Sequence, residues 1–166
     1  MKTVVIRECG EKNIDCDFML DLTETDVKDC LGCWCCWLKT PGRCAHKDLD
    51  DFYRAYLSAD KVIIFSKVTQ GFVSGKLKTL FDRMIPHYLP YISYTSGESM
   101  HTPRYERYPD MEVYYEGEFD TEEERQIYVD YMERLCYQFL SKCDGVKPIS
   151  EYQAEVVAGA QTKEGR

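Results

Sequence analysis

The pattern of hydrophobic and polar positions predicts short strands that alternate with helices. Residues 3–6, 17–22 and 61–66 are predicted strands, and the third is almost continuously apolar, which is typical of a strand buried on both faces of a parallel sheet. Between the second and third strands, apolar residues recur at helical spacing over 48–59, which predicts a helix. A second helix is predicted from Ser74 to just before Pro86. This alternation predicts an α/β domain with a mostly parallel sheet.

The second half of the chain contains the strongest helix signal. Thr121 and Glu124 form a capping box, helical periodicity follows, and Gly145 and Pro148 are stop signals, so a helix of about 20 residues is predicted. Residues 84–118 hold seven of the thirteen tyrosines, and we predict a long ordered loop with one strand at 111–116, whose aromatic content favours a subunit contact. We predict a single domain over residues 1–157 and a flexible tail at 158–166.

Charge and composition exclude several functional classes. The net charge is −8 and no run of lysines or arginines forms a basic stripe, which argues against nucleic acid as a partner. No apolar run approaches the roughly 20 residues that a membrane span needs. The nine cysteines are odd in number and clustered, and no secretory segment follows Met1, so a reducing cytoplasm is the predicted location.

Four cysteines form the candidate metal site, in the spacing Cys30-x2-Cys33-x2-Cys36-x7-Cys44. Soft sulfur ligands at this spacing suit an iron–sulfur cluster or zinc, and the overlapping x2 spacings favour the cluster, because zinc ribbons use well-separated pairs. Two readings without a metal remain open. The thiols can be packed or oxidisable side chains, or Cys33 and Cys36 can act as a C-x-x-C redox pair.

The cysteine segment follows the second predicted strand, and the turn Thr69-Gln70-Gly71 follows the third. Ligands of open α/β sheets bind beyond the carboxyl ends of the strands. We therefore expect both segments on one rim, close enough to form a single pocket that handles electrons. No acid, base or nucleophile triad is evident, so the catalytic residues are unknown and a cofactor is expected to do the chemistry.

Motifs between residues 17 and 90 resemble the NADPH-dependent FMN reductase and iron–sulfur flavoprotein group of the flavodoxin-like superfamily. The matching segments are Asp21-Leu22 through Val27 into Cys30-x-Gly32-Cys33-x2-Cys36, Lys39-Thr40-Pro41-Gly42-x-Cys44, Ala59-Asp60-x-Val62-Ile63-x3-Lys67-Val68, and Gly71-x2-Ser74-x2-Leu77-Lys78-x3-Asp82-Arg83. The resemblance implies a flavodoxin-like three-layer sandwich with an abbreviated first βα unit.

The same resemblance implies a flavin-dependent oxidoreductase or electron-transfer flavoprotein. FMN would lie against Ser66, Val68, Thr69, Gln70 and Gly71, and a [4Fe–4S] cluster would be bound by the four spaced cysteines, with Cys35 an extra thiol. NAD(P)H or a small electron carrier would be the electron source, and a homo-oligomer such as a dimer is expected.

The chain departs from the family between its first two strands. Residues 7–16 contain Glu8, Glu11 and Asp15 and are too few for a helical crossover, so we predict either an antiparallel hairpin of the first two strands or a displaced first strand. No helix N-terminus would then face the phosphate of FMN, and the carboxylates would repel it. The alternative function is therefore a degenerate flavodoxin-like module without FMN, with a structural or interaction role and zinc as its metal.

Overall fold

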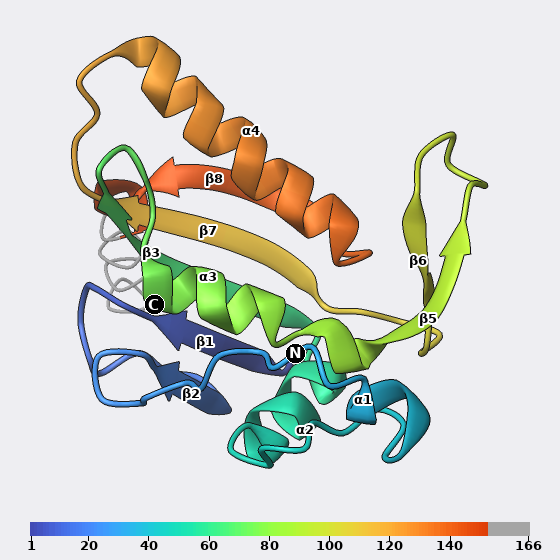
Figure 1. Cartoon of the computed structure of the whole chain (residues 1–166). Helices are drawn as coiled ribbons and strands as arrows, with labels where there is room; N and C mark the ends of the chain where they lie inside the picture. Colours follow the sequence, from blue (N-terminus) through green and yellow to red (C-terminus); the bar gives the residue numbers. More distant parts are fainter. Residues whose placement is uncertain (153–166) are drawn as a thin grey trace.

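The computed structural model describes residues 1–152 (Figure 1). Its elements in chain order are β1 (Thr3–Arg7), β2 (Phe18–Asp21), α1 (Cys35–Leu38), α2 (Asp50–Ser58), β3 (Lys61–Thr69), β4 (Phe72–Val73), α3 (Gly75–Asp82), the 3₁₀ helix η1 (Ile85–His87), β5 (Tyr88–Ser93), β6 (Met100–Pro103), β7 (Asp110–Glu116), α4 (Glu122–Gln138) and β8 (Cys143–Pro148). The predicted tail at 158–166 and the predicted domain end at 157 lie outside the described residues. None of the described helices is both long and apolar enough to cross a membrane.

Five parallel strands form the central sheet in the order β2-β1-β3-β7-β8, and β4 adds an antiparallel pairing at the end of β3. This strand order is the flavodoxin-like one, and it confirms the predicted α/β fold class. The central strand β3 is apolar because both of its faces are covered: Val62, Ile64 and Phe65 are all at most 1% exposed.

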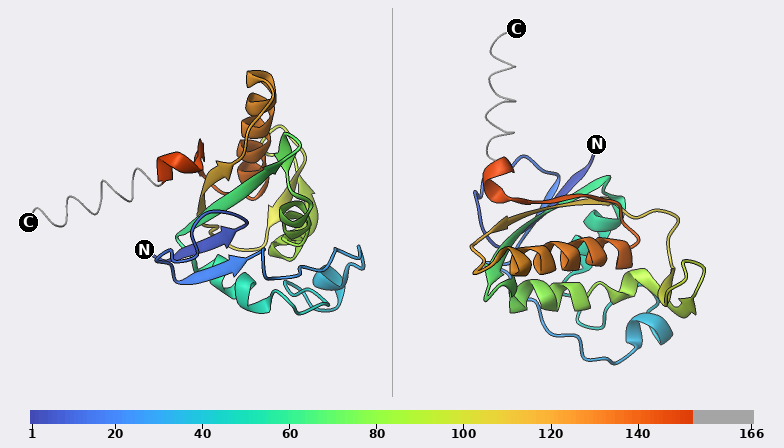
Figure 2. Two further views of the ribbon diagram at one scale, coloured as in Figure 1. Left: turned by 90° about the vertical axis from the view of Figure 1, so that its left-hand side faces the viewer. Right: turned by 90° about the horizontal axis from the view of Figure 1, so that it is seen from above.

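Helices α2, α3 and α4 cover one face of the sheet (Figure 2). Their apolar stripes, with Phe52, Leu77 and Tyr128 among the buried side chains, pack on that face as one core. On the opposite face the described residues provide only the connection 8–17 and the short segment 149–152. The abbreviated first βα unit is thus visible as a β1–β2 connection without a helix.

Strands β1 and β2 are parallel, with Val4 opposite Phe18 and Arg7 opposite Asp21. The prediction of an antiparallel hairpin or a displaced first strand is therefore wrong. Arg7 provides the physical reason. Its guanidinium donates to the carbonyl oxygens of Glu11 (3.1 Å) and Gly10 (3.0 Å) and to the Asp21 carboxylate (2.7 Å), so one buried cation fastens the ends of both strands to the connection between them.

The tyrosine-rich region is more regular than a loop. The prediction is wrong over η1, β5 and β6, because β5 and β6 pair as an antiparallel hairpin that projects from the body of the domain (Figure 1). The predicted strand at 111–116 is confirmed as β7. The capping box is confirmed at α4, where the Thr121 hydroxyl accepts a hydrogen bond from the Glu124 N–H (3.1 Å).

Candidate functional site

The chain after β2 does not stay at the carboxyl edge of the sheet, because it runs back along α3. Lys76 Nζ, in the first turn of α3, donates to the Leu22 carbonyl oxygen (3.1 Å), and Thr79 Oγ1 donates to the Asp29 carboxylate (3.0 Å). At the end of the helix, the Arg83 guanidinium donates to the Lys28 carbonyl oxygen. These three bonds hold the segment 22–29 alongside α3, from the N-terminus of the helix to its C-terminus.

The cysteines and the Thr69 turn consequently lie at opposite ends of α3 (Figure 1). The turn and β4 precede the helix, whereas the cysteine pocket includes Arg83, Ile85 and Pro86, which follow it. A helix of eight residues is about 12 Å long. The expectation of one shared rim and a single pocket is wrong, and the two predicted sites must be considered separately.

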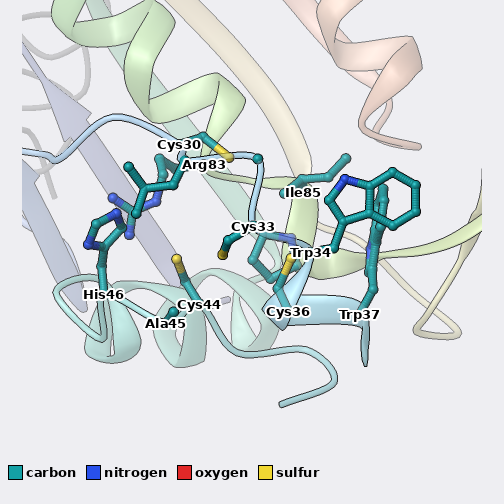
Figure 3. A pocket seen from close by; sticks show the side chains of 13 residues that line it. Cys30, Cys33, Trp34, Cys36, Trp37, Cys44, Ala45, His46, Arg83 and Ile85 are labelled. Carbon is teal, nitrogen blue, oxygen red and sulfur yellow. The ribbon is translucent and has the colours of Figure 1, made fainter. Parts of the chain in front are cut away.

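All four predicted metal-site cysteines line one pocket of about 130 Å³ (Figure 3). Cys35, the extra thiol, is not among the residues that line it. The complete lining is Cys30, Leu31, Gly32, Cys33, Trp34, Cys36, Trp37, Cys44, Ala45, His46, Arg83, Ile85 and Pro86. The walls between the thiols are therefore mainly apolar, and the lining within the described chain contains no carboxylate.

Local structure explains how Cys44 returns to the other three cysteines. Gly42 adopts a φ of 80°, and a Cβ at this position would lie 3.1 Å from the Tyr105 hydroxyl, so glycine permits both the turn and the close approach. The Gly42 N–H donates to the Cys36 carbonyl oxygen (2.9 Å), which closes the turn. Trp37 anchors the segment by donating its indole N–H to the Tyr88 carbonyl oxygen (2.9 Å).

The thiols are close enough to influence one another's charge. Burial raises the pKa of Cys36, and Cys44, Cys30 and Cys33 raise it further, which requires all three to be close. The pKa of Cys33 is lowered, first by the Cys35 backbone N–H and then by the Cys35 thiol, both of which donate to its sulfur. Cys33 is therefore the pocket thiol whose thiolate is specifically stabilised.

A buried cation lies beside the thiols. Arg83 is 1% exposed and forms an ion pair with Asp48. Its Nε has no hydrogen-bond partner within residues 1–152. Asp82, its neighbour in sequence, pairs with Lys78 on the helix surface. Arg83 instead supports the floor of the pocket, a role that only the tertiary structure reveals.

A set of four thiols is the ligand set of a [4Fe–4S] cluster and also of a structural zinc ion. Among the described residues no three His, Cys, Asp or Glu side chains lie close enough together to hold one metal ion. In a [4Fe–4S] cluster each thiolate binds a different iron, so the four sulfur ligands stand farther apart than ligands around one zinc. Four thiols around an apolar cavity with a buried cation match the larger, anionic group.

The predicted flavin residues occupy the other end of α3. Val68 and Thr69 end β3 and pair with β4, and Gln70 and Gly71 form the tight turn between the strands with φ values of 51° and 71°. Ser66 is separated from this turn because it is fully buried and its hydroxyl is bonded to the Tyr128 hydroxyl (2.8 Å). The structure thus brings four of the five residues together and places Ser66 beneath them.

Glu8, one of the carboxylates predicted to repel the phosphate, lies at this end. It follows β1, and its carboxylate accepts hydrogen bonds from the Lys67 N–H (3.1 Å) and the Ser74 hydroxyl. The gap between β1 and β3 is the point where the strand order reverses, at which sheets of this type bind phosphate groups. Its acidic character was visible in the sequence, but its partners lie about 60 residues away and could not be inferred.

The described residues at this point do not fit the phosphate of FMN. The Glu8 carboxylate already occupies the donors at the end of β3 and the start of α3. The pKa of the neighbouring Cys9 thiol is raised to about 12, mainly by burial and then by the carboxylates of Glu116 and Glu8. A second anion would therefore enter a site that is already negative.

Comparisons with known proteins agree with the fold. Residues 3–96 match the sequence model of NADPH-dependent FMN reductases. Two iron–sulfur flavoproteins of Methanocaldococcus jannaschii are similar, one 34% identical over 89 residues (51% of this chain, 45% of the relative) and one 49% identical over 58 residues (34% and 29%). The matched segments therefore cover less than half the length of these relatives. The crystal structure of an azoreductase from Bacillus anthracis str. Sterne shares the fold, with a TM-score of 0.56 at 12% identity over 99% of this chain and 96% of that one.

Proposed function

Because this chain belongs to the NADPH-dependent FMN reductase family, we propose that it is a flavin-dependent oxidoreductase whose cysteine pocket holds an iron–sulfur cluster. The proposed ligands of a [4Fe–4S] cluster are Cys30, Cys33, Cys36 and Cys44. The observation that carries this proposal is that these four thiols, and not Cys35, line one apolar-walled pocket. NAD(P)H or a small carrier is the proposed electron source.

Each part of the pocket has a role in this proposal. A bound cluster supplies one-electron transfer. The four thiols hold it, and the side chains of Trp34, Ile85 and Pro86 limit the access of water. The buried guanidinium of Arg83 offsets the negative charge that four thiolates introduce, and charge near a cluster is one of the factors that set its reduction potential.

At the other end of α3, we propose that Ser66, Val68, Thr69, Gln70 and Gly71 form the contact for the flavin ring. A bound flavin supplies hydride and single-electron chemistry. Val68 to Gly71 offer a turn at the carboxyl edge, and the bond between Ser66 and Tyr128 fixes the strand beneath it. The flavin and the cluster would then be two separate redox centres, with the short helix α3 between them.

We further propose that the protein is cytoplasmic and forms a homo-oligomer. The nine free cysteines suit a reducing compartment. The hairpin of β5 and β6 exposes Tyr91, Ile92 and Tyr94, which are 66%, 50% and 70% exposed. Exposed aromatic side chains of this kind are enriched at protein interfaces, so this hairpin is the proposed subunit contact.

Anaerobic reconstitution with iron and sulfide tests the cluster. The wild-type chain should take up about four irons and develop a broad absorbance shoulder near roughly 400 nm. Cys36→Ser should lose most of both signals, whereas the matched variant Cys35→Ser should keep them, because its side chain is outside the pocket lining. Equal losses in the two variants, or a wild-type chain that takes up zinc but no iron, would contradict the proposal.

A second candidate function is a module without FMN that has a structural or interaction role. The observation that favours it is the Glu8 carboxylate at the phosphate position. The absorbance spectrum of the anaerobically purified protein separates the two, because a flavin gives a band at about 450 nm and a cluster does not. If neither a flavin nor a cluster is present or can be loaded, the second candidate is the correct one.

A further inference from the structure

The bonds of Glu8 place it where a flavin phosphate would otherwise be held. The Glu8 backbone N–H donates to the Phe65 carbonyl oxygen (2.9 Å), so the residue is still aligned beside the end of β3. One carboxylate oxygen accepts from the Lys67 N–H (3.1 Å), and the other accepts from the Ser74 hydroxyl. A backbone N–H at a strand end and a hydroxyl at a helix start are donors of the kind that bind phosphate in α/β proteins.

The hydroxyl of Ser74 has no hydrogen-bonding capacity left for a phosphate donor contact, because its proton is already donated. It is the N-cap of α3, and its hydroxyl oxygen accepts from the Leu77 N–H (3.1 Å) while its proton is donated to Glu8. Arg7, the cation next to Glu8 in sequence, is also occupied, since it binds Asp21 and two carbonyl oxygens of the connection. A phosphate would have to displace the Glu8 side chain and then lie beside its charge.

We propose that Glu8 is a built-in substitute for the flavin phosphate, so that this chain recognises a flavin by its ring system and gains no affinity from the phosphate of FMN. This inference rests on the proposed flavin site at the Thr69 turn and names the form of ligand that the site accepts. Riboflavin, which carries the same ring without the phosphate, should then bind at least as tightly as FMN.

The test is the ratio of FMN affinity to riboflavin affinity, measured anaerobically by quenching of flavin fluorescence on the full-length chain. The wild-type chain should bind FMN no more tightly than riboflavin. Glu8→Gln removes the charge and keeps the size of the side chain, so it should raise the ratio by about tenfold, the scale of one relieved charge repulsion near a surface. Glu8→Ser, which opens more space, should change the ratio in the same direction.

Glu11→Gln is the matched control, because Glu11 is an exposed carboxylate in the same connection. It should leave the ratio unchanged. Wild-type protein that binds FMN tenfold or more tightly than riboflavin would overturn the inference, as would an unchanged ratio in both Glu8 variants. If the wild-type chain binds neither flavin, recognition through the ring is wrong, even if a Glu8 variant binds FMN.

The inference and the proposed function fail in different ways. If riboflavin binds and the ratio does not respond to Glu8, the ring site stands and only the role of Glu8 is wrong. If no variant binds either flavin, the ring site and the role of Glu8 are both wrong, whereas iron uptake by the cysteine pocket is measured independently.

Discussion

The polar groups at the two ends of α3 lie in different surroundings. At the C-terminal end, four thiols surround an open pocket of about 130 Å³ and a buried arginine lies beside them. At the N-terminal end, the Glu8 carboxylate satisfies the donors of Lys67 and Ser74. The comparison teaches that the polar groups at one end line an open pocket, whereas those at the other end are satisfied by a carboxylate of the same chain.

Two hollows of the molecule also differ in the charge of their linings. A hollow beyond the ends of β7 and β8 is lined by Glu118, Asp120 and Glu122, with Arg125 as the cation among its lining residues. The lining of the cysteine pocket has Arg83 and His46 and no carboxylate within the described chain. The lining of the cysteine pocket therefore carries basic side chains, whereas the lining of the hollow is mainly acidic.

The largest effect on stability is expected at the cysteine end of α3, from the change Asp48→Asn. The change leaves the Arg83 guanidinium buried without its charged partner, so the free energy of unfolding of the apo-protein should fall by about 3–5 kcal/mol in urea denaturation. Asp82→Asn is the control, because the Lys78–Asp82 pair is exposed on the helix surface and should contribute less than about 1 kcal/mol. Equal effects of the two changes would contradict the assigned role of Arg83.

The same pair predicts an acid dependence. Burial by itself would raise the pKa of Asp48, but the hydrogen bond from Arg83 outweighs it and the pKa is lowered. The stabilisation is thus complete above the ordinary pKa of an aspartate and is lost as the pH falls through the lowered, folded-state value. Asp48→Asn should flatten this acid limb, and a limb identical to that of the wild-type chain would show that another group causes it.

A smaller effect is expected at the turn end from Gly117→Ala. Gly117 has a φ of 138°, and an added Cβ would lie 2.7 Å from Val68 Cβ, so the unfolding free energy should fall by about 1–3 kcal/mol. Riboflavin binding should also weaken, because Val68 is displaced, while iron uptake should not change. Gly97→Ala, at a position with open space, should cost about 1 kcal/mol and affect neither ligand. Loss of iron uptake in Gly117→Ala would show that the two ends are not independent.

The smallest expected effect is a difference in pH-dependent reactivity between two thiols of the cysteine pocket, Cys33 and Cys36. In the apo-protein, alkylation of Cys33 should reach half of its maximal rate at a lower pH than alkylation of Cys36, because the Cys35 N–H and thiol lower the pKa of Cys33 and burial raises that of Cys36. Peptide mass spectrometry across a pH series measures both. Cys35→Ala should move the Cys33 profile upward, since it removes the thiol donor. Identical profiles for Cys33 and Cys36 would refute this assignment and also the C-x-x-C redox alternative.

The sequence by itself determined the local features of this protein. Alternating strand and helix patterns predicted the α/β sheet, the Thr121 capping box predicted the start of α4, and the cysteine spacing predicted which four thiols line one pocket. The short connection after the first strand indicated that the phosphate loop is missing. Each of these signals depends on residues close together in the chain, where spacing alone constrains the geometry.

Only the tertiary structure decided where these features meet. The segment 22–29 is directed by bonds to Lys76, Thr79 and Arg83, which lie 50 to 55 residues after their partners, and these bonds separate the cysteines from the turn. The parallel pairing of β1 with β2 and the capture of Glu8 by Lys67 and Ser74 have the same origin. An extended segment has no periodicity that fixes its direction, so distant hydrogen bonds determine it.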